Sequence, residues 1–157
     1  MRTWNTMNEI KKITISVYSG YGPEWDEFVE TILVQPHFIS YVHQPYQTNE
    51  NILPYSGNAK IHLKYENQSE SFSGFYQRLC SVLLSIDVEF ENSCVICDGM
   101  PVVIEFEKKN GERVIINTVH GTEVADRVGE CLPDILSMVY PRPAIFPYED
   151  EEDEEED

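Results

Sequence analysis

The stretch VVIEFEKKNGERVIINTV, residues 102–119, constrains the fold of this chain more than any other part of the sequence. Apolar residues alternate with polar or charged ones on both sides of the pair Asn110-Gly111. Alternation with a period of two is typical of a strand with one buried face, and an Asn-Gly pair supplies the two positive-φ positions of a tight turn between antiparallel strands. The stretch therefore predicts a β-hairpin.

Further stretches predict the remaining strands. Residues 11–22 and 61–65 alternate apolar and polar side chains, and residues 88–97 also have the composition of a strand. Residues 24–47 leave two alternatives open, because some of their apolar residues fit helical spacing whereas most are β-branched or aromatic. We favour a hairpin here, since Gln35-Pro36-His37 predicts a turn between two strands.

Two segments predict helices. Residues 69–86 carry an apolar stripe at steps of three and four, and Ser69 or Ser71 can cap the first turn. Residues 122–140 carry a second apolar face with Thr122 as the cap, and Pro133 interrupts this helix because proline lacks the amide that would donate to the preceding turn. An antiparallel sheet with one or two helices packed on one face follows, which is the α+β class.

The chain of 157 residues has the size of one domain and divides into four parts. We expect a flexible leader at residues 1–10, a single α+β domain at 11–140, an extended proline-rich strap at 141–148 and a disordered acidic tail at 149–157. No apolar run is long enough to span a membrane, and the N-terminus lacks the apolar stretch of a secretory signal. The four cysteines are expected to be reduced, so a cytoplasmic protein is predicted.

Negative charge decides which partners the chain favours. The formal net charge is −17, from 11 basic and 28 acidic residues, and nine of the acids form the C-terminal run Glu149 to Asp157. The first 148 residues still hold 11 bases against 19 acids, which leaves −8 on the body of the protein. Such a surface repels nucleic acid and anionic lipid and favours basic proteins, or else it serves solubility alone.

The sequence contains no catalytic or metal-binding pattern. Cys94 and Cys97 have the C-x-x-C spacing of zinc and redox sites, but further soft ligands at matched spacing are lacking, and we interpret the pair as buried thiols. The four histidines show no ligand spacing. Glu105 and Glu107 share one face of a predicted strand, where a carboxylate pair can serve acid–base chemistry or simply be exposed. We therefore expect no enzyme, no metal and no cofactor.

The second half of the chain resembles a known pattern. Residues 96–121, ICDGMPVVIEFEKKNGERVIINTVHG, are followed by a short helix that ends in LPDILSMV at residues 132–139. This order is similar to that of small bacterial immunity-type proteins and phage accessory proteins, in which an Asp-Gly turn, a V-I-E-F strand, a glycine turn and a terminal helix follow one another. The resemblance implies an inhibitor encoded beside a toxin, or an accessory protein of a phage or mobile element.

Charge and resemblance together predict a protein-binding inhibitor, a bacterial immunity protein that neutralises a basic toxin by occlusion. In such a protein the acidic surface steers the basic partner and a few aromatic anchors supply the binding energy. Two alternatives stay open: a phage-type anti-defence protein that mimics nucleic acid, and a small enzyme or ligand-binding module. The predicted partner-binding residues are Trp25, Tyr18, Tyr21, Tyr41, Tyr46, Tyr55, Glu105, Glu107, Glu149, Asp150, Glu151, Glu152 and Asp153.

Overall fold

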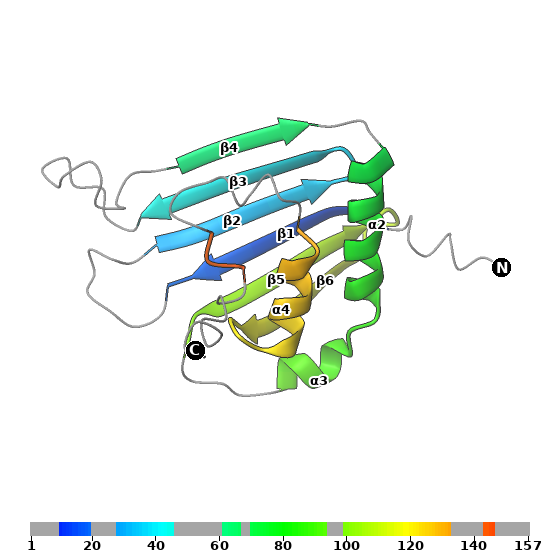
Figure 1. The fold of residues 1–157 in the computed structure, drawn as a ribbon. Helices are drawn as coiled ribbons and strands as arrows, with labels where there is room; N and C mark the ends of the chain where they lie inside the picture. The colour runs from blue at the N-terminus through cyan, green and yellow to red at the C-terminus, as the bar shows by residue number, and fades with distance from the viewer. Residues whose placement is uncertain are drawn as a thin grey trace, which may run out of the picture.

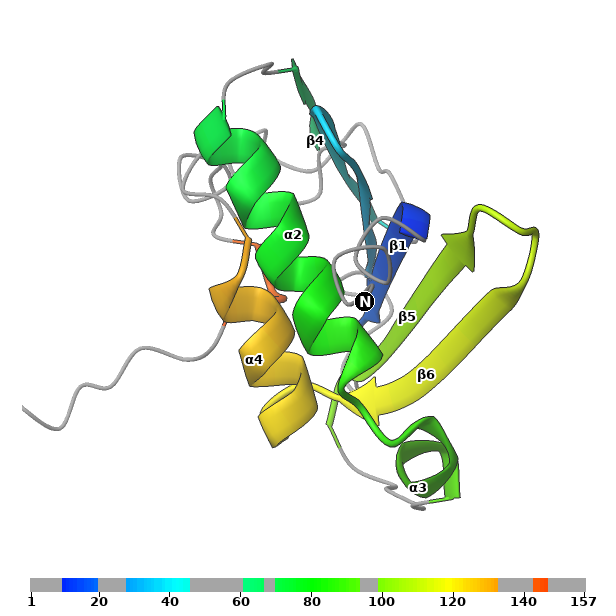
Figure 2. The same cartoon turned by 90° about the vertical axis from the view of Figure 1, so that its right-hand side faces the viewer.

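The computed structural model describes residues 10–19, 28–45, 61–66, 70–93, 99–132 and 143–146. The elements are β1 (Ile10–Tyr18), β2 (Phe28–Gln35), β3 (Phe38–Pro45), β4 (Ile61–Glu66), α2 (Glu70–Leu84), α3 (Val88–Ser93), β5 (Pro101–Lys108), β6 (Arg113–Val119) and α4 (Glu123–Glu130). The six strands form one antiparallel sheet in the order β4-β3-β2-β1-β5-β6 (Figure 1). Helices α2 and α4 cover one face, and α3 packs against the edge strand β6 (Figure 2). The predicted α+β class is confirmed.

Alternate side chains of the central strands build the core. In β1, Ile13, Ile15 and Val17 are fully buried on the face that the helices cover, and the residues between them point to the opposite face. Helix α2 contributes Leu79 and Leu83, which lie on one side of the helix because they are four residues apart. Each such buried side chain stabilises the fold by about 1.5–3 kcal/mol relative to an exposed one.

The strands predicted from alternation are present in β1, β4, β5 and β6. Residues 24–47 contain the hairpin of β2 and β3, in which Gln35 pairs with Phe38, so the helical alternative for this segment is wrong. Its β-branched and aromatic residues outweigh its helical spacing because they pack well on the pleated surface of a sheet.

Both predicted helices are also present. Helix α2 lies within residues 69–86, and α4 occupies the first part of residues 122–140. Thr122 caps α4 as expected, since its hydroxyl oxygen accepts a hydrogen bond from the amide of Ala125 at 3.3 Å. The helix ends at Glu130, and Pro133 lies outside the described residues.

Residues 88–93 form the helix α3, so the strand predicted over residues 88–97 is wrong in its first part. The carboxylate of Asp87 accepts a hydrogen bond from the amide of Phe90 at 3.1 Å, which starts the helix. Glu89 and Glu91 lie in the first turn, where a helix favours negative charge. The Cys94–Cys97 segment lies outside the described residues.

Two connections differ from their predictions as well. Gly111 adopts a φ of 95° and donates its amide to the carbonyl of Lys108 at 2.9 Å, but Asn110 does not adopt a positive φ. The β5–β6 connection is therefore a type I turn followed by a left-handed glycine, which is longer than the predicted two-residue turn. Residues 143–146 form a turn, in which the amide of Phe146 donates to the carbonyl of Pro143 at 3.3 Å, and not the extended strap that was expected.

Candidate functional site

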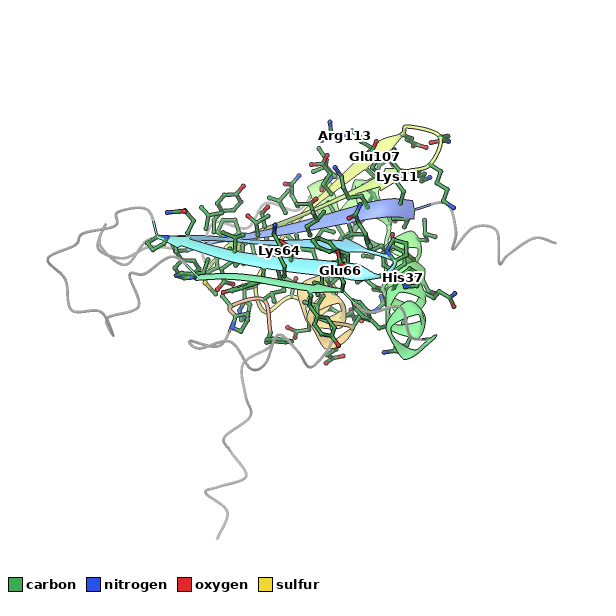
Figure 3. All side chains as sticks on the ribbon, turned by 90° about the horizontal axis from the view of Figure 1, so that it is seen from above. Lys11, His37, Lys64, Glu66, Glu107 and Arg113 are labelled. Atoms are coloured by element: carbon green, nitrogen blue, oxygen red, sulfur yellow. The ribbon has the colours of Figure 1, made fainter. Side chains whose placement is uncertain are left out.

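The face of the sheet away from α2 and α4 carries no helix among the residues that the structure describes (Figure 3). Strands β1, β5 and β6 present polar and charged side chains there, because the other half of each alternation is buried in the core. Glu107 and Arg113 project from this face in Figure 3. We call it the open face.

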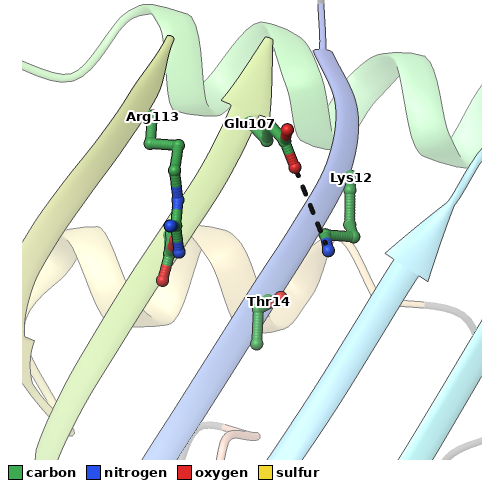
Figure 4. Close-up of a pocket in the computed structure, with 5 residues that line it drawn as sticks. Lys12, Thr14, Glu107 and Arg113 are labelled. Carbon is green, nitrogen blue, oxygen red and sulfur yellow. Dashed lines mark hydrogen bonds and ion pairs between the residues drawn. The ribbon is translucent and has the colours of Figure 1, made fainter. Parts of the chain in front are cut away.

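Five side chains of the open face surround a shallow pocket of about 210 Å³ (Figure 4). Lys12 and Thr14 come from β1, Glu105 and Glu107 from β5, and Arg113 from β6. The sheet register brings them together, since Thr14 lies opposite Glu105 and Lys12 lies opposite Glu107. The pocket is open to solvent and has a predominantly polar lining.

Ion pairs neutralise the two carboxylates of this pocket. Glu107 lies 3.5 Å from the ammonium group of Lys11 and 3.9 Å from that of Lys12, and Glu105 pairs with the guanidinium group of Arg113. Exposed pairs of this kind contribute only about 0–1 kcal/mol to stability. Glu105 and Glu107, predicted as partner-binding acids, therefore lie together as expected but within a locally balanced set of charges.

A second cluster lies on the opposite, helix-covered face and is buried. The side chain of Glu30 is 3% exposed, and its Oε2 accepts hydrogen bonds from the Tyr41 hydroxyl at 2.6 Å and from Nδ1 of His43 at 3.3 Å. Its Oε1 accepts a hydrogen bond from the backbone amide of Ala144 at 2.7 Å. Burial, followed by the charge of Glu30, raises the pKa of Tyr41 above its ordinary value, so the hydroxyl keeps the proton that it donates.

This cluster fastens the C-terminal turn to the sheet. Ala144 is 114 residues away from Glu30 along the chain, and its neighbour Ile145 is fully buried in the core. Nε2 of His120 lies 3.0 Å from the carbonyl oxygen of Phe146 at the other end of the same turn. Because both oxygens of Glu30 are occupied by protein groups, we interpret the cluster as a structural anchor, which we call the Glu30 anchor.

The described thiols are not activated. Cys80 is buried and Cys131 is partly exposed, and neither forms a disulfide. Burial raises the pKa of the Cys80 thiol from 9.0 to about 11, and it raises the pKa of Cys131 as well. Since the thiolate is the reactive form, neither group is poised as a nucleophile near neutral pH.

Charge is distributed unevenly over the described residues. They hold eight bases and 12 acids, a net charge of −4 against −17 for the whole chain. Five of the bases and three of the acids lie at the start of β1 and around the β5–β6 hairpin, a region that we call the hairpin end. These residues are Lys11, Lys12, Lys108, Lys109, Arg113, Glu105, Glu107 and Glu112.

The remaining described residues hold three bases and nine acids. Helix α3 and the first turn of α4 lie at the same end of the molecule in both views (Figures 1 and 2), which we call the acidic end. None of its carboxylates forms an ion pair with a described residue. These carboxylates are Asp87, Glu89, Glu91, Glu123 and Asp126.

The aromatic residues predicted to bind a partner are only partly placed. Tyr18 is 40% exposed at the end of β1, as an anchor must be. Tyr41 is fully buried, so its prediction as a partner-binding residue is corrected: it is a core residue that binds Glu30. The other predicted positions lie outside the described residues, namely Trp25, Tyr21, Tyr46, Tyr55, Glu149, Asp150, Glu151, Glu152 and Asp153.

Phe90 was not predicted, although it is the most exposed of the large apolar side chains identified in the described residues, at 59%. The sequence does contain a signal for the helix that carries Phe90. Asp87 lies three residues before Phe90, and Glu89 and Glu91 flank it, which is typical of a helix start. The alternation of Val88 and Phe90 with acids obscured this signal by suggesting a strand.

Comparisons with family models, with curated proteins and with solved structures found no match for this chain, so the resemblance to immunity-type proteins stays a prediction. Within the described residues, no helix is long and apolar enough to cross a membrane. In that part of the chain, no group of three or more histidine, cysteine, aspartate or glutamate residues is arranged to hold a metal ion.

Proposed function

We propose that this protein is a cytoplasmic, protein-binding inhibitor of the immunity type, which neutralises a basic toxin by occlusion. The observation that carries this proposal is the acidic end, where five carboxylates have no ion-pair partner among the described residues. The open face does not carry it, because its acids are paired with bases.

Physical reasons connect this surface to a basic partner. Unpaired carboxylates on two helices at the same end of the molecule create a negative potential that raises the rate of encounter with a basic protein. A toxin that acts on nucleic acid needs a basic surface to bind phosphate, and covering that surface blocks it. Occlusion of this kind depends only on the complementary shape and charge of the two protein surfaces.

The proposal is tested by capturing the partner from the cells in which the protein occurs and then purifying it. Association rates are measured with the full chain and with a chain lacking residues 149–157, between about 0.1 M and about 1 M salt, over which the Debye length falls from about 10 Å to about 3 Å. We expect the rate to fall about tenfold or more with salt and also to fall on truncation. Rates that respond to neither change would rule out electrostatic steering of a basic partner.

The shallow pocket favours a second candidate, a module that binds a small ligand. Lys12 and Arg113 bring positive charge, and Glu105 and Glu107 bring negative charge, to the same opening. A small zwitterion complements both signs. Titration with free amino acids, followed by amide shifts of Thr14 and Glu105, distinguishes this candidate, since an inhibitor that acts through the acidic end leaves these amides unmoved.

A further inference from the structure

Helix α3 lies at the margin of the core, against which only its partly buried Val88 packs among the described residues, yet hydrogen bonds hold the helix to the sheet. None of its residues is buried. It is fixed through Asn92, whose Nδ2 donates to the carbonyl oxygen of Ile115 at 2.8 Å and whose Oδ1 accepts from the amide of Asn117 at 2.7 Å. These two groups of β6 point away from β5, so the amide of Asn92 takes the place that a further strand would occupy at the sheet edge.

The side chain that α3 displays is apolar. Phe90 is 59% exposed, and Ile115, whose carbonyl oxygen Asn92 binds, is 46% exposed on the adjoining strand. A phenyl ring that is mostly in water contributes little to stability, whereas a pocket on a partner can remove it from water completely. Aromatic side chains in rigid positions are the usual anchors of protein interfaces because little entropy is lost on binding.

Charge selects the kind of partner. Phe90 lies between Glu89 and Glu91, and Asp87 caps the same helix. The chain contains no lysine or arginine from residue 79 to residue 107, and Arg127 of α4, which donates to the Ser85 hydroxyl at 3.3 Å, forms no ion pair with these three acids. A basic surface complements α3, whereas an acidic surface or nucleic acid is repelled.

We propose that α3 is the docking element of this protein, with Phe90 as the anchor that enters an apolar pocket on a basic partner protein. Glu89 and Glu91 then face basic side chains around that pocket. This inference rests on the proposed function and adds to it the location of the contact. It assigns to Asn92 the positioning of the helix before the partner arrives.

The test uses the purified basic partner from the capture experiment and full-length variants of this protein. Phe90→Ala should weaken binding about 30-fold or more, mainly through faster dissociation, as the loss of a central anchor does. Gln77→Ala is the control, because Gln77 is exposed on helix α2 and belongs to none of the predicted partner-binding residues, and the affinity of this variant should stay within about threefold of the wild type. Glu89→Gln together with Glu91→Gln should lower the association rate at low salt and have little effect at high salt.

The outcomes separate the docking element from the proposed function. If the wild-type chain binds the basic partner and Phe90→Ala binds equally well, α3 is not the docking element, although the inhibitor proposal stands. If the wild-type chain captures no basic protein, both are overturned. If Phe90→Ala instead abolishes self-association in sedimentation experiments, the occupant is a second copy, and the basic partner at α3 is ruled out. Unchanged urea midpoints for all variants exclude misfolding as the cause.

Discussion

Removal of the Glu30 anchor should strongly destabilise this protein. Glu30 lies on β2 directly opposite His43 on β3, and it joins the β2–β3 hairpin to the turn at residues 143–146. Glu30→Ala removes the acceptor of three hydrogen bonds at once and introduces no new group.

The magnitude follows from the groups that lose their partner. The Tyr41 hydroxyl is fully buried, and the side chain of His43 is 7% exposed, so water cannot replace the carboxylate. Each buried donor left unsatisfied costs about 1–3 kcal/mol, and Glu30→Ala leaves three donors without their acceptor. We expect the free energy of unfolding to fall by about 3–5 kcal/mol, which is a large part of the stability of an ordinary domain.

Urea denaturation of Glu30→Ala, Tyr41→Phe and the double variant measures the effect. The double variant should lose less stability than the sum of the single variants, by about 1 kcal/mol or more, because the Tyr41 hydroxyl needs no acceptor once it is absent. Glu66→Ala is the matched control, since Glu66 is exposed on β4, and it should change stability by at most about 0.5 kcal/mol. The amide of Ala144 should also exchange faster in Glu30→Ala, even without denaturant.

A loss of less than about 1 kcal/mol in Glu30→Ala would refute this reasoning, because it would mean that the donors find other partners. Strict additivity in the double variant would refute it as well, since Tyr41 and Glu30 would then act independently.

Two further predictions concern backbone conformation and alkaline pH. Gly74→Ala in α2 should stabilise the protein by about 0.5–1 kcal/mol in the urea assay, because a Cβ there meets nothing within 4 Å. Gly111→Ala should destabilise it by about 1–2 kcal/mol, because Gly111 has a φ of 95°. Equal effects of the two substitutions would contradict the turn geometry. The buried Cys80 keeps its proton to a pKa of about 11 in the folded state, but the unfolded chain loses it above the ordinary value of 9.0. The contribution of the Cys80 proton to the free energy of unfolding is therefore fully present below pH 9 and is lost towards about pH 11, at up to roughly 1.4 kcal/mol per pH unit. Cys80→Ala should therefore flatten the decline of the urea midpoint with pH in that range.

The sheet could be predicted from the sequence because the pattern that specifies each strand lies within that strand. In β1 the alternation of Ile13, Ile15 and Val17 assigns each residue to a face, and one buried face requires no knowledge of distant segments. The β2–β3 hairpin was settled by its composition and by the turn at Pro36. Helix α3 was not predicted because its first four residues alternate like a strand, although Asp87 and the glutamates of the first turn are local signs of a helix start.

The candidate sites were harder to predict because they depend on contacts between distant segments. The partners of Glu30 lie 11, 13 and 114 residues away, and no sequence pattern links them. The same holds for Asn92, whose contacts with Ile115 and Asn117 span 23 and 25 residues. Composition correctly indicated an acidic body, but pairing in the sheet register decides that Glu105 and Glu107 are neutralised while the acids of α3 are not.

The uneven distribution of charge predicts that the Glu30 anchor also affects the rate at which this protein associates with a basic partner. The hairpin end carries five bases and three acids, a net charge of +2, and the rest of the described residues carries three bases and nine acids, a net charge of −6. A basic protein is therefore repelled by one end and attracted to the other, which orients it during encounter. The anchor holds Ala144 on the helix-covered face, and the run of acids begins at Glu149, only three residues after the described turn ends at Phe146. Glu30 therefore fixes the position of the described turn from which the chain continues towards that run of acids. Because Glu30→Ala releases this turn, it should slow association with the proposed basic partner at low salt even under conditions where the variant is fully folded, and an unchanged rate would show that the position of the turn does not affect association.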